Sequence, residues 1–191
     1  MSSIIEDGVT RHRISVSEYY RMAEVGLLAP DARVELIEGE FVDMAPIGSE
    51  HGGTVYALNR LLVEAVGTRA VVLVQGPIRL GPRSEPQPDL ALLRARADGY
   101  KRAHPTPTDT LLVIEVSDTT LRYDLQTKVP LYARHGIPEV WVVDLENRRL
   151  RVFRSPAEGG YAESAETDAP GLTPLPALDG VSIDLATLFD F

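Results

Sequence analysis

Three charged side chains lie where the folding pattern alone gives no reason for a charge. Asp89 follows Pro88 at the start of an expected strand, Glu115 interrupts the most apolar run of the chain, and Lys128 lies within an expected helix. A carboxylate in a buried strand is costly unless it is paired, protonated or bound to a cation. Two carboxylates held close together also repel each other, and a divalent cation removes that repulsion. Oxygen ligands with room for water suit Mg²⁺ or Mn²⁺, so a metal site is one of the arrangements that the two carboxylates allow.

The neighbours of Lys128 indicate how a helix could present polar groups to such a site. Asp124, Lys128 and Tyr132 are spaced by four residues, which places them on one helix face. Apart from Lys101, every other basic residue of the chain is an arginine. The spacing is compatible both with a functional lysine and with a simple surface ion pair between Asp124 and Lys128.

The composition is that of an ordinary folded protein. Of the 191 residues, 44% are hydrophobic and 25% are charged, which is sufficient for a buried core. The sequence has no cysteine, which excludes disulfide frameworks, zinc–thiolate sites and thiol nucleophiles. It contains no apolar run of membrane-spanning length, no signal-peptide pattern and no phosphate-binding glycine loop. We therefore expect a cytoplasmic protein with no membrane contact and no nucleotide cofactor.

The charge is unevenly distributed along the chain. The formal net charge is −9, and residues 155–191 contain acidic residues but neither lysine nor arginine. We expect one domain over residues 1–154 and an acidic, proline-containing appendage over 155–191 that packs on it. Such a balance argues against nonspecific coating of nucleic acid, so binding would need a metal ion and local basic groups. The candidates in the polar segment 94–109 are Arg94, Arg96, Lys101 and Arg102.

The order of expected elements predicts the fold class. Periodicity and turn residues predict helices after Ser15, over 55–66 and over 121–135, the last with a kink at Pro130. Expected strands form a hairpin over 34–44 and occupy 70–74, 77–80, 88–93, 111–116, 140–145 and 149–153. The strand at 111–116 is apolar enough to be buried on both faces. This mixed order predicts an α/β protein with one central mixed sheet flanked by helices.

Several of these segments together resemble a known family. The motifs are QPDL at 87–90, IEVS at 114–117, IPEVWVVD at 137–144 and ELIEGE at 35–40, together with His51, Asp124, Lys128 and Tyr132. Over residues 15–154 the chain resembles the Uma-two family of restriction-endonuclease-like proteins in the PD-(D/E)xK nuclease superfamily. The resemblance implies a restriction-endonuclease-like core with an N-terminal hairpin. It also implies a metal-dependent endonuclease that hydrolyses phosphodiester bonds of DNA.

The resemblance assigns roles to individual residues. Asp89, Glu115 and the backbone carbonyl of Val116 would bind Mg²⁺ or Mn²⁺, which polarises the phosphate and activates a water molecule. The superfamily places a lysine two residues after the glutamate, where this chain has Ser117. Lys128 from the following helix would take that place, orienting the water or helping to deprotonate it.

Three accessory residues complete the expected site. Asp124 would hold Lys128 in position, whereas Glu35 and His51 would border the site without an assigned step.

Two other functions remain compatible with the sequence. Ser117 at the usual lysine position and the acidic balance would also suit a catalytically inactive nuclease fold that serves as a binding or scaffolding module. Hydrolysis of another phosphoester by the same metal site is a further alternative. By analogy with the superfamily we expect a homodimer.

Overall fold

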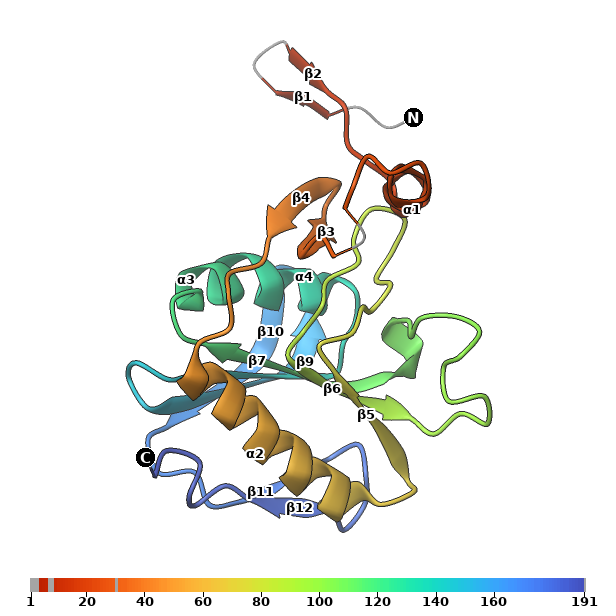
Figure 1. Ribbon diagram of the computed structural model, residues 1–191. Helices are drawn as coiled ribbons and strands as arrows, with labels where there is room; N and C mark the ends of the chain where they lie inside the picture. Colours follow the sequence, from red (N-terminus) through yellow and green to blue (C-terminus); the bar gives the residue numbers. More distant parts are fainter. Residues whose placement is uncertain (1–3, 7–8, 30, 191) are drawn as a thin grey trace.

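A six-stranded mixed sheet forms the centre of the protein (Figure 1). The computed structural model describes residues 4–6, 9–29 and 31–190. The strand order is β10-β9-β8-β7-β6-β5, and within this sheet β7 and β8 are parallel whereas the other neighbours are antiparallel. The strands are β5 (Ala70–Val74), β6 (Leu90–Arg94), β7 (Thr110–Ser117), β8 (Glu139–Asp144), β9 (Arg149–Ala157) and β10 (Gly160–Thr167). The predicted central mixed sheet is confirmed.

The parallel pairing of β7 with β8 requires a crossover between them, and a helical segment makes it. It comprises α3 (Leu121–Tyr123), the π-helical turn η2 (Asp124–Lys128) and α4 (Val129–Arg134). In place of the kink expected at Pro130, the structure has this wide turn directly before the proline. Val129 donates its backbone N–H to the carbonyl of Asp124, five residues back. Pro130 has no N–H to give to the carbonyl of Gln126, which explains why the normal helical ladder is interrupted here.

The strand β7 determines which side of the sheet Glu115 faces. All eight of its residues are buried, as predicted for a central strand. Successive side chains point to opposite faces, so Ile114 and Val116 pack with α2, whereas Val113 packs with α4. Glu115 therefore lies on the same face as α4 and η2.

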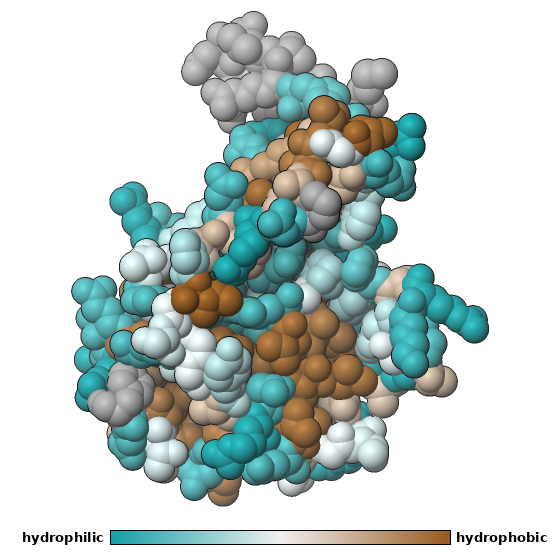
Figure 2. Space-filling view, in the orientation of Figure 1, coloured by the Kyte–Doolittle hydropathy of each residue, from teal (hydrophilic) through white to brown (hydrophobic). Residues whose placement is uncertain are grey.

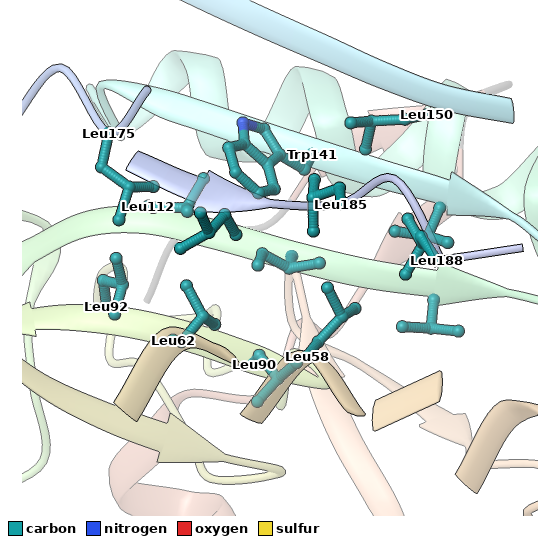
Figure 3. Packing of buried hydrophobic residues seen from close by; sticks show 14 of the residues in the cluster. Leu58, Leu62, Leu90, Leu92, Leu112, Trp141, Leu150, Leu175, Leu185 and Leu188 are labelled. Carbon is teal, nitrogen blue, oxygen red and sulfur yellow. The ribbon is translucent and has the colours of Figure 1, made fainter. Parts of the chain in front are cut away.

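The helix α2 (Ser49–Val66) covers the other face of the sheet. Leu58 and Leu62 from this helix lie beside Leu90 and Leu92 of β6, in the same hydrophobic cluster as Trp141 of β8 (Figure 3). Trp141 and Tyr132 are fully buried, so both contribute to the core. No helix within the described ranges is long and apolar enough to cross a membrane.

The C-terminal residues are more closely integrated than an appendage. The predicted boundary at Arg154 falls inside β9, and β10 pairs along β9 as the edge of the central sheet. Two salt bridges join these strands, from Arg149 and Arg151 to Glu166, at 2.8 and 2.6 Å. The short strands β11 (Leu172–Pro174) and β12 (Ser182–Asp184) follow, and the remaining tail packs on the α2 side through Leu175, Ile183, Leu185 and Leu188.

The N-terminal elements project from one side of the sheet (Figure 1). They are the strand pair β1 (Ile4–Glu6) and β2 (Val9–Arg11), the helix α1 (Val16–Glu24), and the hairpin β3 (Val34–Ile37) and β4 (Glu40–Asp43). A capping box of Ser15 and Glu18 begins α1, and the predicted hairpin is present. The helix predicted after Ser15 ends at Glu24, ahead of Gly26, whose φ is 76°.

The strand predicted over 77–80 is wrong. The backbone N–H of Ile78 bonds to the carbonyl of Pro86, and the N–H of Leu80 bonds to that of Ser84, both at 3.0 Å. The segment therefore closes a local loop with the residues just before β6 instead of joining the sheet. Glu85 of this loop bridges to Leu36, which fastens the hairpin to the body of the protein.

Gly39 at the hairpin turn provides a test of this arrangement. Its φ is 84°, and a Cβ there would lie 2.7 Å from the Cβ of Arg13. Gly39→Ala should therefore lower the free energy of unfolding by about 1–3 kcal/mol in urea denaturation. Gly53→Ala in α2 is the matched control, because its Cβ would meet open space and should stabilise the helix slightly. Equal effects of the two substitutions would contradict the close approach at the turn.

Candidate active site

Asp89 and Glu115 come together because their strands are neighbours. Asp89 directly precedes β6, and Glu115 lies near the end of the antiparallel β7. The backbone N–H of Val116 donates to Asp89 Oδ2 at 2.9 Å, and Gln75 Nε2 donates to Oδ1 at 3.3 Å. These bonds hold the Asp89 carboxylate at the edge of the sheet where β7 ends.

Glu115 is buried, with 3% of its surface exposed. The hydroxyl of Tyr132 donates to Glu115 Oε1 at 2.6 Å, and Lys128 Nζ lies 3.3 Å from the same oxygen. Burial raises the pKa of Glu115 to about 8, against the opposing attraction of Lys128. Glu115 therefore holds its proton more tightly than an ordinary glutamate.

Lys128 lies between two carboxylates. Its Nζ is 3.2 Å from Glu35 Oε1 and 3.3 Å from Glu115 Oε1. Burial opposes its charge, but Glu115, Glu35 and Asp124 together outweigh burial and raise the pKa of Lys128 above its ordinary value. Glu35 is itself fixed, because its Oε2 accepts the backbone N–H of Gln87 at 3.0 Å. The hairpin strand β3 thus supplies a direct partner of Lys128.

Asp124 has different contacts from those expected. Its Oδ2 accepts hydrogen bonds from Ser117 Oγ at 2.8 Å and from Thr120 Oγ1 at 2.6 Å. Asp124 acts on Lys128 through its charge, whereas the direct contacts that hold Lys128 come from Glu35 and Glu115. Ser117, at the position where the superfamily has lysine, anchors Asp124 at the start of the π-helical turn.

His51 lies near the start of α2 and reaches Asp89. Its Nε2 is 3.1 Å from Asp89 Oδ2, and this hydrogen bond raises the pKa of His51 although burial opposes it. The other ring nitrogen, Nδ1, is buried without a partner in the described structure. The hydroxyl of Tyr123 is likewise buried and unpartnered. Both residues line the cavity that contains the carboxylates.

This cavity has a volume of about 250 Å³. Its walls come from the hairpin, the β4–α2 connection, the ends of β5 and β7, and the crossover segment. Acidic side chains outnumber basic ones in its lining. The acids are Glu35, Asp43, Asp89, Glu115, Asp118 and Asp124, and the bases are Arg33 and Lys128.

The donor atoms fit a divalent cation that keeps much of its own water. Within the described ranges, no group of three or more histidine, cysteine, aspartate or glutamate side chains is arranged to hold a metal ion. The candidate donors are the carboxylates of Asp89 and Glu115 and the carbonyl of Val116. Mg²⁺ commonly binds through one or two carboxylates, with waters and substrate phosphates as its other ligands. The cavity offers room for those ligands, so the residues fit such an ion.

The basic residues expected to contact nucleic acid lie elsewhere. Arg94 is the last residue of β6, whereas Asp89 precedes its first, so the segment 94–102 begins at the opposite end of that strand. Arg96 pairs with Asp98 at 2.5 Å and its guanidinium stacks on Tyr100. None of Arg94, Arg96, Lys101 and Arg102 lines the cavity described above.

Some contacts had little or no signal in the sequence. Gln75 reaches Asp89 from the end of β5, and nothing in its surroundings along the chain marks it. Tyr123 lines the cavity from α3. It precedes Asp124 by one residue, so it lies outside the set Asp124, Lys128 and Tyr132 that the helical spacing had marked. The contact of Tyr132 with Glu115 could have been found, because Tyr132 follows Lys128 by one helical turn.

The mixed α/β fold is one that a solved structure shares. A solved structure described as that of a putative nuclease belonging to DUF820, from Anabaena variabilis ATCC 29413, is similar with a TM-score of 0.70. The two share 16% sequence identity, and the match covers 93% of this chain and 98% of that one, so the fold is shared.

The family assignment comes from the sequence profile. The profile of the Uma2 family, described as "Putative restriction endonuclease", matches residues 16–186, and the chain belongs to this family. No curated protein matches the chain. The resemblance seen in the motifs is therefore confirmed at the level of the family and the fold.

Proposed function

We propose that this protein is a divalent-metal-dependent endonuclease that hydrolyses phosphodiester bonds of DNA. The observation that carries the proposal is the convergence of Asp89, Glu115 and Lys128 on one cavity from two strands and a helical turn. Membership of the Uma2 family supports the same reaction class. The proposed cofactor is Mg²⁺ or Mn²⁺, held by Asp89, Glu115 and the carbonyl of Val116.

Each residue has a defined task in this proposal. When bound, the cation polarises the phosphate and lowers the pKa of a water molecule. Lys128 carries a positive charge beside Glu115, where it can orient a water molecule and offset negative charge on the phosphate. Glu35 keeps Lys128 in place from the hairpin. His51 and Gln75 hold the Asp89 carboxylate by hydrogen bonds from two sides.

A cleavage assay tests the proposal. Purified protein should cut DNA in Mg²⁺ or Mn²⁺ and lose this activity in EDTA. Asp89→Asn removes a charged ligand and should reduce cleavage at least about 100-fold. Asp179→Asn is the matched control, because Asp179 is exposed and lies outside the cavity. Cleavage by Asp89→Asn at the rate of the control would rule out this site.

A catalytically inactive scaffolding module is the second candidate. Two observations favour it: Lys128 is already engaged by two carboxylates, and Ser117 occupies the usual lysine position. Failure to bind Mn²⁺ in calorimetry, together with no cleavage of any DNA, would select it. The homodimer expected by analogy belongs to the main proposal, and light scattering after size-exclusion chromatography tests it.

A further inference from the structure

The candidate site lies inside a cavity and not on an open surface. Glu115, Glu35 and Lys128 are 3%, 4% and 7% exposed, and the side chain of Asp89 is 14% exposed. The cavity of about 250 Å³ is smaller than most pockets that enclose a drug-sized ligand, which hold about 300–1,000 Å³. A phosphodiester must therefore enter a narrow space to reach these residues, and a slender strand can do so more easily than a rigid duplex.

The same cavity has an apolar wall. The connection between β4 and α2 contributes Met44, Pro46 and Ile47, and Ile47 is 44% exposed. Where this connection runs in Figure 1, Figure 2 shows hydrophobic surface beside hydrophilic surface. Apolar and aromatic side chains bind nucleobases that are unpaired or turned out of a helix. An intact duplex keeps its bases inside and would present only its charged backbone to this wall.

The charge of the cavity also disfavours a duplex. Acidic side chains dominate its lining, and of the two bases Lys128 is already paired with Glu35 and Glu115. Arg33 is exposed, and its guanidinium has no ion-pair partner in the described part of the chain. Duplex DNA carries one charge per about 1.7 Å of its axis, against about 3.4 Å for each strand alone. One free arginine suits the lower charge density of a single strand.

We propose that the site takes DNA that is single-stranded or locally unpaired. The phosphate to be cut lies at Asp89, Glu115 and Lys128, and the adjoining nucleoside packs on Met44, Pro46 and Ile47. The next phosphate along the strand pairs with Arg33. This inference rests on the proposed nuclease function and specifies the form of its substrate.

The inference is tested with one labelled oligonucleotide sequence in three forms. These are a single strand, a blunt duplex, and a duplex with a central unpaired bubble. Binding is measured by fluorescence polarisation in Mn²⁺, and cleavage is followed on gels in the same buffer. The single strand and the bubble should bind at least about tenfold more tightly than the duplex and be cut faster. Ile47→Ser should weaken single-strand binding about tenfold without changing Mn²⁺ affinity in calorimetry, because it removes apolar surface and adds no charge. Val63→Ser, on the exposed side of α2 and outside the cavity, should have no effect.

The outcomes separate this inference from the proposed function. Equal or tighter binding of the duplex, or faster cleavage of it, overturns the inference while leaving a nuclease. Preferential binding of the single strand without cleavage of any DNA supports the inference for binding and overturns the proposed reaction. Absence of binding to all three oligonucleotides overturns both. Equal binding by Ile47→Ser and Val63→Ser overturns the placement of the nucleoside.

Discussion

Lys128→Ala should reduce the rate of DNA cleavage by about two to three orders of magnitude, the loss typical of removing one group that stabilises developing charge. Lys128 is the one lysine that lines the described cavity, and its Nζ lies 3.3 Å from Glu115 Oε1. Arg33 is exposed and cannot replace it at the buried carboxylates. The measurement is the initial rate of cleavage in Mn²⁺.

Controls must separate catalysis from folding. Removing one partner of a buried ion pair can cost about 3–5 kcal/mol of stability, so rates should be compared where circular dichroism shows the variants folded. Lys128→Met, which keeps most of the aliphatic chain, should be as inactive as Lys128→Ala. Arg60→Ala is the matched control, because Arg60 is exposed on α2 and lies outside the cavity. Full activity in folded Lys128→Met would show that the lysine takes no part in the reaction.

In the metal-free protein, the free energy of unfolding should fall as the pH rises from about 4.5 to about 8. Burial raises the pKa of Glu115 from 4.5 to about 8, so across this window the folded state binds a proton that the unfolded state releases. Stability decreases with pH wherever the folded state binds more protons. Lys128 stays charged in both states over the same window, because its pKa is raised above 10.5. Protonated Glu115 therefore makes its full contribution to the free energy of unfolding near pH 4.5, and that contribution is lost near pH 8.

Glu115→Gln isolates this effect. Urea unfolding in EDTA at the two ends of the window should show a smaller decrease in the variant than in the wild type. Glu158→Gln, an exposed glutamate outside the cavity, should behave like the wild type. Adding Mg²⁺ should stabilise the wild type most at the alkaline end, because the cation binds the ionised carboxylate. Parallel pH profiles for Glu115→Gln and the wild type would contradict the assignment of the titration to Glu115.

The convergence of Asp89, Glu115 and Lys128 could be predicted because local patterns placed each residue. An apolar run marked β7 as central, and a proline marked the start of the neighbouring strand. The helical spacing of Asp124, Lys128 and Tyr132 marked the face that turns toward the sheet. These are short-range signals, and adjacent strands then brought the residues together.

The partners of these residues could not be predicted in the same way. The contact of Glu35 with Lys128 depends on how the hairpin docks, which is fixed by distant bonds such as that between Leu36 and Glu85. The role of Ser117 as an anchor for Asp124 depends on the π-helical turn, which follows from Pro130 only once the helix is in place. Similarly, the domain boundary at Arg154 was predicted from the absence of basic residues after it. The central sheet continues past Arg154, because β10 pairs with β9.

The most direct test of the proposed metal site is an anomalous difference map from a crystal soaked in Mn²⁺. The expected result is a peak between the carboxylates of Asp89 and Glu115, close to the carbonyl of Val116, that disappears in Asp89→Asn. A peak bound elsewhere, or no peak at these carboxylates in a crystal that contains Mn²⁺, would contradict the proposed active site.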